Sequence, residues 1–303
     1  MNPPDLAIST SWNSARHTDG LAMLEELAAL GFTSVELSHG IRYSLWPGLL
    51  KALDQKIIRV ASLHNFCPLP VGFLKASPNC YEFTDPRRSR RETAVRLTKE
   101  TIDHAAAFGA KAVVLHLGTL RQRHCSRELV TLMAKGQLGS RDYVRKKIAA
   151  VREHETLFPA VWPLLKECLL TISEHARAKN IRLGFESREA VEEVPLENQW
   201  PLVLNEFPDA GYWHDFGHSA QKDALGFLDH EAEFRQRLPR LIGCHLQDFR
   251  PPDRDHLAPG DGVIPFEKFL PLMVSDPVCV LELSSRAKRE QVLASLAWWR
   301  AKT

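Results

Sequence analysis

Short apolar segments alternate with longer amphipathic stretches along the whole chain, and this alternation restricts the fold more than any other feature. Eight such segments occur, at residues 6–12, 34–38, 59–64, 112–118, 182–187, 211–216, 242–248 and 279–283. Nearly continuous apolar segments of this length are typical of parallel strands buried on both faces. Eight strands alternating with helices favour an α/β fold, a single (β/α)8 barrel with eight parallel strands. No G-x-G-x-x-G follows the first strand, which argues against a dinucleotide-binding sheet.

The stretches between these segments have the periodicity of helices. The predicted helices are 19–30, 87–108, 162–179, 224–238, 265–274 and 287–301. Asp19 is a suitable N-cap for the first, and Gly31 and Gly109 end the first two. We expect one domain over residues 1–303, with a basic helical insertion at about 121–159 after the fourth strand. That insertion has two interpretations, a solvated surface excursion or a lid that binds anions beside the barrel mouth.

Charge and cysteine content narrow the class of protein. The chain has 39 basic and 37 acidic side chains and a net charge of +2, which argues against nucleic acid or an anionic membrane as a partner. No apolar run is long enough to span a bilayer, and the N-terminus lacks the pattern of a signal peptide. None of the six cysteines forms a C-x-x-C pair, so we expect reduced thiols and a cytoplasmic protein.

Acidic and imidazole side chains recur where the predicted strands end. These residues are Glu36, His64, His116, Glu186, Asp215, His245 and Glu282. In a barrel the strand ends converge on one face, where buried charged groups are costly unless they are paired or bound to metal. A divalent cation explains the whole set, because it removes carboxylate repulsion and accepts mixed nitrogen and oxygen ligands.

Two further motifs extend this set. Asp215 and His218 are three residues apart, so both can face one site from a strand end and the loop that follows. The segment 253–262 contains His256, followed by Pro259-Gly260-Asp261-Gly262, and its glycines permit a tight loop after the seventh strand.

Together these residues resemble the xylose isomerase-like barrel superfamily, which includes sugar epimerases, dehydratases and the endonuclease IV group. The resemblance covers nearly the whole chain, and its most specific parts are Asp215-x-Gly217-His218 and the Pro259–Gly262 turn. For the epimerase-like members it implies one metal held by Glu186, Asp215, His245 and Glu282, with the two glutamates also exchanging protons. It further implies that His218 contacts substrate oxygens, and that Glu192 matches a position that binds substrate hydroxyls.

The endonuclease IV group holds three zinc ions with nine ligands, and this sequence matches eight of them. The eight are His64, His116, Glu186, Asp215, His218, His245, His256 and Glu282. The ninth position, two residues before His256, carries Arg254, whose guanidinium cannot ligate a metal. We expect Asp253 and Asp255 to point elsewhere in a rigid turn. His64, His116, His218 and His256 are therefore candidates for a second metal or for substrate contacts.

Three hypotheses for function follow. The first is a metal-dependent sugar or polyol isomerase or epimerase, or a related lyase, in which proton transfer passes through a metal-stabilised enediolate with Glu186 and Glu282 as acid and base. The second is an endonuclease IV-like zinc-dependent phosphodiester hydrolase, and the third is a non-catalytic barrel. The ligands suit manganese or zinc, and also magnesium, with one or two ions per chain. A homo-oligomer is left open.

Other side chains are candidates for contacts with a small carbohydrate or polyol substrate. Glu36 ends the second strand, and Trp12, the best aromatic candidate, follows the first and suits the apolar face of a sugar. Arg250, Arg188 and Arg286 flank the metal strands and are candidates to bind a carboxylate or phosphate.

Overall fold

The fold is a closed barrel of eight parallel strands, as the alternation predicts. The computed structural model describes residues 5–273 and 276–302. The barrel strands are β1 (Leu6–Ser9), β2 (Ser34–Leu37), β3 (Arg59–His64), β4 (Ala112–Leu115), β5 (Arg182–Glu186), β6 (Gly211–Asp215), β7 (Leu241–Leu246) and β10 (Val278–Leu281). They close in the order β1-β10-β7-β6-β5-β4-β3-β2, with every pair parallel. A two-stranded antiparallel hairpin, β8 (Asp248–Arg250) with β9 (Arg254–Leu257), follows β7.

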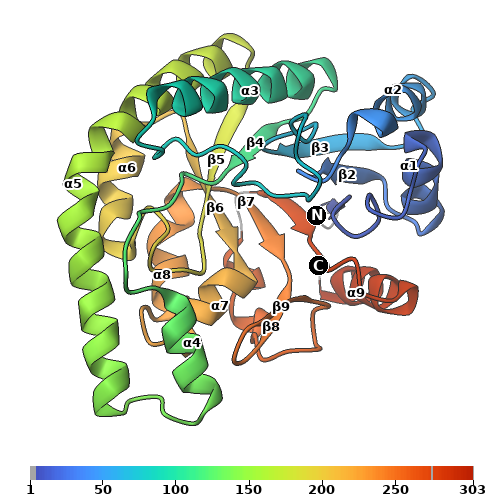
Figure 1. The fold of residues 1–303 in the computed structure, drawn as a ribbon. Helices are drawn as coiled ribbons and strands as arrows, with labels where there is room; N and C mark the ends of the chain where they lie inside the picture. The colour runs from blue at the N-terminus through green and yellow to red at the C-terminus, as the bar shows by residue number, and fades with distance from the viewer. Residues whose placement is uncertain (1–4, 274–275, 303) are drawn as a thin grey trace.

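Helices surround the barrel (Figure 1). They are α1 (Gly20–Ala29), α2 (Trp46–Asp54), α3 (Arg88–Ala107), α4 (Ser126–Ala134), α5 (Arg141–Ala178), α6 (Trp200–Glu206), α7 (Phe216–Ala224), α8 (His230–Arg237) and α9 (Arg289–Lys302). Asp19 caps α1 by accepting hydrogen bonds from Leu21 N and Ala22 N, and Gly31 adopts φ +95° after the helix ends. No helix of the described residues is both apolar and long enough to cross a membrane.

Three helix predictions need correction. The first part of the insertion forms the separate helix α4, whereas its second part and the expected helix at 162–179 form one 38-residue helix, α5, which contains Pro159 and Pro163 and runs the length of the barrel's side (Figure 1). Residues 224–238 hold only the last residue of α7 and a separate helix, α8. Residues 266–272 form two short 3-10 turns instead of a helix, and Val274 lies outside the described residues.

Trp213 of β6 fills the barrel interior together with small and branched side chains. Its cluster contains Ala7, Ala112, Val114, Trp213, Ile242 and Val280. A Cβ atom added at Gly184 or Gly243 would lie 2.8 or 2.1 Å from the indole, so both neighbouring strands need glycine there. The barrel centre is therefore packed solid, and a ligand can approach only at its ends.

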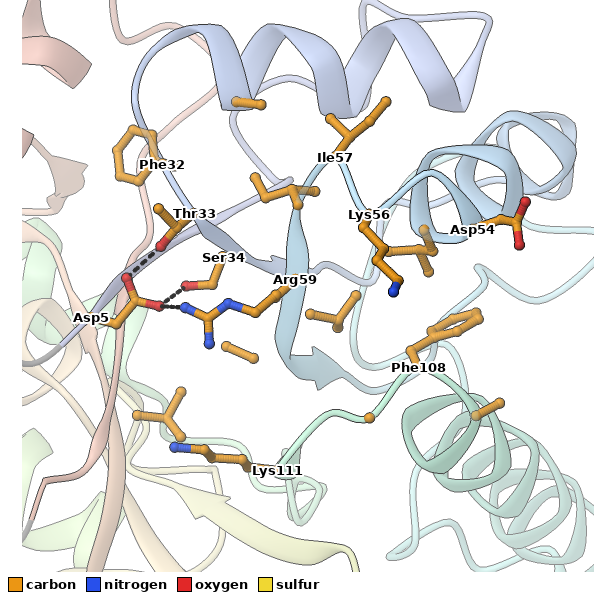
Figure 2. Close-up of a pocket in the computed structure, with 18 of the residues that line it drawn as sticks. Asp5, Phe32, Thr33, Ser34, Asp54, Lys56, Ile57, Arg59, Phe108 and Lys111 are labelled. Atoms are coloured by element: carbon orange, nitrogen blue, oxygen red, sulfur yellow. Dashed lines mark hydrogen bonds and ion pairs between the residues drawn. The ribbon is translucent and has the colours of Figure 1, made fainter.

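The end of the barrel where the strands begin has a cavity of about 1160 Å³ between α2, α3 and β2–β3. There Asp5 accepts hydrogen bonds from Thr33 and Ser34 and pairs with Arg59 at 2.6 Å (Figure 2). None of the metal-ligand clusters found among the described residues includes a side chain from this end. In (β/α)8 enzymes the chemistry takes place at the opposite end, where the strands finish.

Candidate metal centre

The polar side chains predicted at the strand ends lie together at that opposite end of the barrel. His64, Glu186 and Asp215 are the last residues of β3, β5 and β6, and His116 and Glu282 directly follow β4 and β10. His245 is the fifth residue of β7. The parallel register carries each of them to the same level, and all six are buried.

Glu186 lies at the centre of four nitrogen donors. Its Oε2 is 2.9 Å from His116 Nε2 and 3.1 Å from His64 Nε2. Its Oε1 is 3.0 Å from Arg188 Nη1 and 3.2 Å from His218 Nδ1. Burial opposes ionisation of this carboxyl, but His116 and Arg188 hold its pKa well below the usual value.

His64 and His116 are oriented by oxygen atoms on their far sides. His116 Nδ1 lies 3.0 Å from Asn79 Oδ1, and His64 Nδ1 lies 3.1 Å from the carbonyl of Asn65. Both oxygens can accept a hydrogen bond from Nδ1, which leaves each Nε2, on the side of Glu186, as the nitrogen available to a metal ion. Metal-binding histidines in proteins are oriented in this way. Burial and the charge of Arg188 lower the pKa of His116 to about 3, which keeps its ring neutral.

His245 repeats this arrangement with the two nitrogens exchanged. Its Nε2 is 3.2 Å from both carboxylate oxygens of Glu36. Its Nδ1 faces Glu282 Oε2 at 3.2 Å and one oxygen each of Glu186 and Asp215 at 3.6 Å, yet it makes no hydrogen bond. An orphaned buried nitrogen that faces three carboxylates fits a cation-binding position.

The donor sets support this interpretation. Four groups have ligand atoms that all lie within 4.8 Å of one another: Glu186, Asp215 and His245; Glu36, His245 and Glu282; His64, His116 and Glu186; and His218, Asp255 and His256. Mixed imidazole and carboxylate donors suit zinc or manganese. The residues present therefore fit a divalent metal.

Gln247 connects two parts of the site, and its role was not predicted from the sequence. Its Nε2 donates to both oxygens of Asp215 at 2.9 and 2.8 Å, and its Oε1 accepts a hydrogen bond from His256 N. Asp215 also caps α7 by accepting from His218 N at 2.8 Å, so the three-residue spacing does bring Asp215 and His218 together.

Asp255 corrects our expectation for the turn that contains His256. We expected Asp253 and Asp255 to point away from the site. Instead, Asp255 Oδ2 lies 2.9 Å from His256 Nδ1, and both residues cluster with His218. The segment is the hairpin β8–β9, and His256 has φ +52°, which changes the direction of successive side chains. Asp255 thus adds a carboxylate to the group of His218 and His256, beside Arg254, whose guanidinium cannot ligate a metal.

A cavity of about 620 Å³ opens above these ligands. Of the four residues expected to hold the first metal, Glu186 and Glu282 line this cavity, whereas Asp215 and His245 lie beneath it. Its wall also includes His64, His116, His218, His256, Arg188 and Glu189. Among the predicted substrate contacts, His218, Arg188 and Arg286 are part of this wall, as are the candidates for a second metal or substrate contact, His64, His116 and His256.

The other four predicted contacts lie outside the cavity wall. Glu36 is fully buried behind His245 and also accepts from Ser62 Oγ. Trp12 is buried, and its indole nitrogen donates to Ala287 O. Glu192 lies in the loop after β5, and its side chain accepts a hydrogen bond from Ser126 N. Arg250 donates to the carbonyl of Asp261. A position near a strand end did not determine which way these side chains point.

The sequence profile of the xylose isomerase-like TIM barrel family matches residues 24–302. The chain belongs to this family. A comparison with curated proteins finds no match in sequence. The family assignment therefore rests on this profile together with the closed eight-stranded barrel.

Solved structures show the same xylose isomerase-like fold at low sequence identity. A D-tagatose 3-epimerase-like protein matches with a TM-score of 0.69 at 15% identity, covering 98% of this chain and 97% of its own. The 3-keto-D-glucoside 4-epimerase YcjR from E. coli matches with a TM-score of 0.65 at 14% identity, covering 98% and 99%. The TTHB071 protein from Thermus thermophilus, after soaking with ZnCl2, has a TM-score of 0.58 at 21% identity, covering 99% and 97%.

Proposed function

We propose that this protein is a metal-dependent isomerase or epimerase of a sugar or polyol. The observation that carries the proposal is the placement of Glu186 and Glu282. Both belong to the cluster around His245 Nδ1, and both also line the cavity. Two carboxylates that contact a bound substrate from different strands can remove and return a proton on carbon. The sugar epimerases among the structural neighbours support the same reaction class.

The metal would be held by Glu186, Asp215, His245 and Glu282, with Glu36 orienting His245. A divalent cation bound there supplies Lewis-acid polarisation of a neighbouring carbonyl or hydroxyl oxygen. Asp215 is held in place by Gln247 and does not line the cavity, so its role is to bind the ion.

The two glutamates have different surroundings, which suggests different roles. Glu186 accepts contacts from four nitrogen donors and stays ionised. Glu282 has fewer partners, His245 Nδ1 at 3.2 Å and His256 Nε2 at 3.8 Å. We assign proton removal to Glu186, because its ionised carboxylate can accept the proton, and we assign proton return on the other side of the carbon to Glu282 in its protonated form.

The test begins with solvent-deuterium incorporation into ketoses and polyols, using protein loaded with manganese or zinc. For the substrate found, Glu282→Gln should lower kcat by about 10²- to 10⁴-fold, the usual contribution of a general acid or base. The circular dichroism spectrum should be unchanged. Glu192→Gln is the matched control, since Glu192 lies outside the cavity wall and should keep full activity. If Glu282→Gln retained most of its turnover, the assignment would be wrong.

One observation favours a second candidate, a zinc-dependent phosphodiester hydrolase. Besides the cluster at His245, the ligand groups His64–His116–Glu186 and His218–Asp255–His256 offer places for further ions. Several zinc ions together can activate water and stabilise a leaving oxygen. Elemental analysis that found two or more zinc ions per chain, with cleavage of DNA at abasic sites, would support this candidate over the first. One ion per chain without cleavage would exclude it.

A further inference from the structure

Three arginines line the cavity above the metal ligands, and one of them is fully engaged by acidic side chains. Arg188 lies 3.0 Å from Glu186, 2.9 Å from Glu189 and 2.8 Å from Glu193. Its guanidinium is buried and surrounded by carboxylates. The positive charge of Arg188 is therefore neutralised by carboxylates of the protein itself.

Arg254 and Arg286 are in a different situation. Arg254 lies on β9 and Arg286 in the loop between β10 and α9, and both line the same cavity. Both are exposed, and neither guanidinium has an ion pair or hydrogen bond with any residue in 5–273 or 276–302. Two cationic groups, one from β9 and one from the loop between β10 and α9, thus lie at the cavity mouth without partners among these residues.

The acidic groups nearby do not neutralise this pair. Asp255 is occupied by His256 at 2.9 Å, and Glu189 by Arg188 at 2.9 Å. Glu282 lies deeper, against His245, and Asp253 is exposed at the mouth, so among the described residues one unpaired carboxylate at the mouth faces two unpaired guanidiniums.

We propose that Arg254 and Arg286 bind an anionic group on the substrate, a phosphate or a carboxylate. This inference rests on the proposed function, because it places the reacting carbon at Glu186 and Glu282 and the anionic group at the mouth. Guanidinium groups bind such anions through paired, charge-assisted hydrogen bonds. The sugars named for the neighbouring epimerases, 3-keto-D-glucoside and D-tagatose, are uncharged. The substrate of this protein would differ from them by its charge.

The experiment measures binding by isothermal titration to the metal-loaded protein. The probes are fructose, fructose 6-phosphate, glucuronate and inorganic phosphate. We expect a charged sugar to bind at least about tenfold more tightly than fructose, a difference of about 1.4 kcal/mol. Whether fructose 6-phosphate or glucuronate binds better identifies the anionic group. Equal affinities for charged and uncharged sugars would overturn the proposal.

Variants separate the arginines from the metal, which binds phosphate by itself. Arg254→Gln/Arg286→Gln should lose the preference for the charged sugar, while fructose binding and metal content stay unchanged. Arg250→Gln is the matched control, because Arg250 lies on the same hairpin but not in the cavity wall. Unchanged anion affinity in the double variant would refute the assignment. Since these measurements need no turnover, their failure is distinct from retained activity in Glu282→Gln, which would refute the isomerase.

Discussion

Glu36 acts on the site without lining the cavity. Its two oxygens lie 3.2 Å from His245 Nε2, and Ser62 donates to Oε2 at 2.9 Å. The carboxylate fixes the ring orientation and increases the electron density on Nδ1, the nitrogen that faces Glu186, Asp215 and Glu282. Partners of this kind set the affinity of a metal site nearly as much as the ligands do.

We predict that Glu36→Gln lowers metal affinity by about tenfold or more, the usual effect of losing such a partner. The side chain keeps its shape and one acceptor, so the fold should be retained. Competition with a chromophoric chelator measures the affinity. Glu192→Gln is the control, because it makes the same change of charge at a residue outside the metal-ligand groups. Equal affinities for wild type and Glu36→Gln would show that Glu36 does not support the metal.

Single residues also show where prediction from the sequence ends. The seven residues at strand ends converge as predicted, because the closed barrel brings all parallel strand ends to one face. Asp255 could not be assigned in this way. Its direction depends on the register of the hairpin β8–β9 and on the positive φ of His256, which tertiary contacts determine. Trp12 likewise turned out to donate to Ala287 instead of lining the cavity, because its direction follows from packing against a distant loop.

Among the secondary-structure elements, strands were easier to predict than helices. All eight barrel strands begin within one residue of their predicted starts, because short apolar segments bounded by polar residues have few other interpretations. The helix α5 differs, since it continues through Pro159 and Pro163, across the predicted boundary between the insertion and the helix at 162–179. A proline inside a helix removes one hydrogen bond locally, and packing of the helix against the barrel and the neighbouring loop outweighs that loss.

The helix α5 supports the loop that carries Arg188, Glu189 and Glu193. His154 of α5 is fully buried, with Nδ1 2.7 Å from Val191 O and Nε2 3.1 Å from Gln199 Oε1. We predict that His154→Phe, which keeps the volume and removes both hydrogen bonds, increases amide exchange across residues 187–196. Thr156→Ala, an exposed change on the same helix, is the control for hydrogen-exchange mass spectrometry. Unchanged protection of the loop would show that α5 does not support it.

At the scale of the whole molecule, charged side chains have different surroundings at the two ends of the barrel. Where the strands begin, the ion pair of Asp5 with Arg59 balances charge within the protein. Where they finish, the buried carboxylates of Glu36, Glu186, Asp215 and Glu282 surround His245. Burial lowers the pKa of His245, but Glu282 and Glu36 raise it well above its ordinary value. The four carboxylates around His245 therefore favour a cation at this position.

Metal removal should therefore destabilise the barrel, because the four proposed ligands join four adjacent strands, β5, β6, β7 and β10. A ligand that binds only the folded chain at 100 times its Kd stabilises it by about 2.7 kcal/mol. For a chain of this size we predict that chelation lowers Tm by about 5 °C or more, and that stoichiometric manganese or zinc restores it. Differential scanning calorimetry measures the Tm and elemental analysis measures the bound metal. Potassium added in place of the divalent ion, at equal ionic strength, is the control. Asp255→Asn should reduce the number of bound ions only if the His218–Asp255–His256 group holds one. A Tm that chelation leaves unchanged, in a protein that binds no divalent ion, would contradict the proposed metal centre.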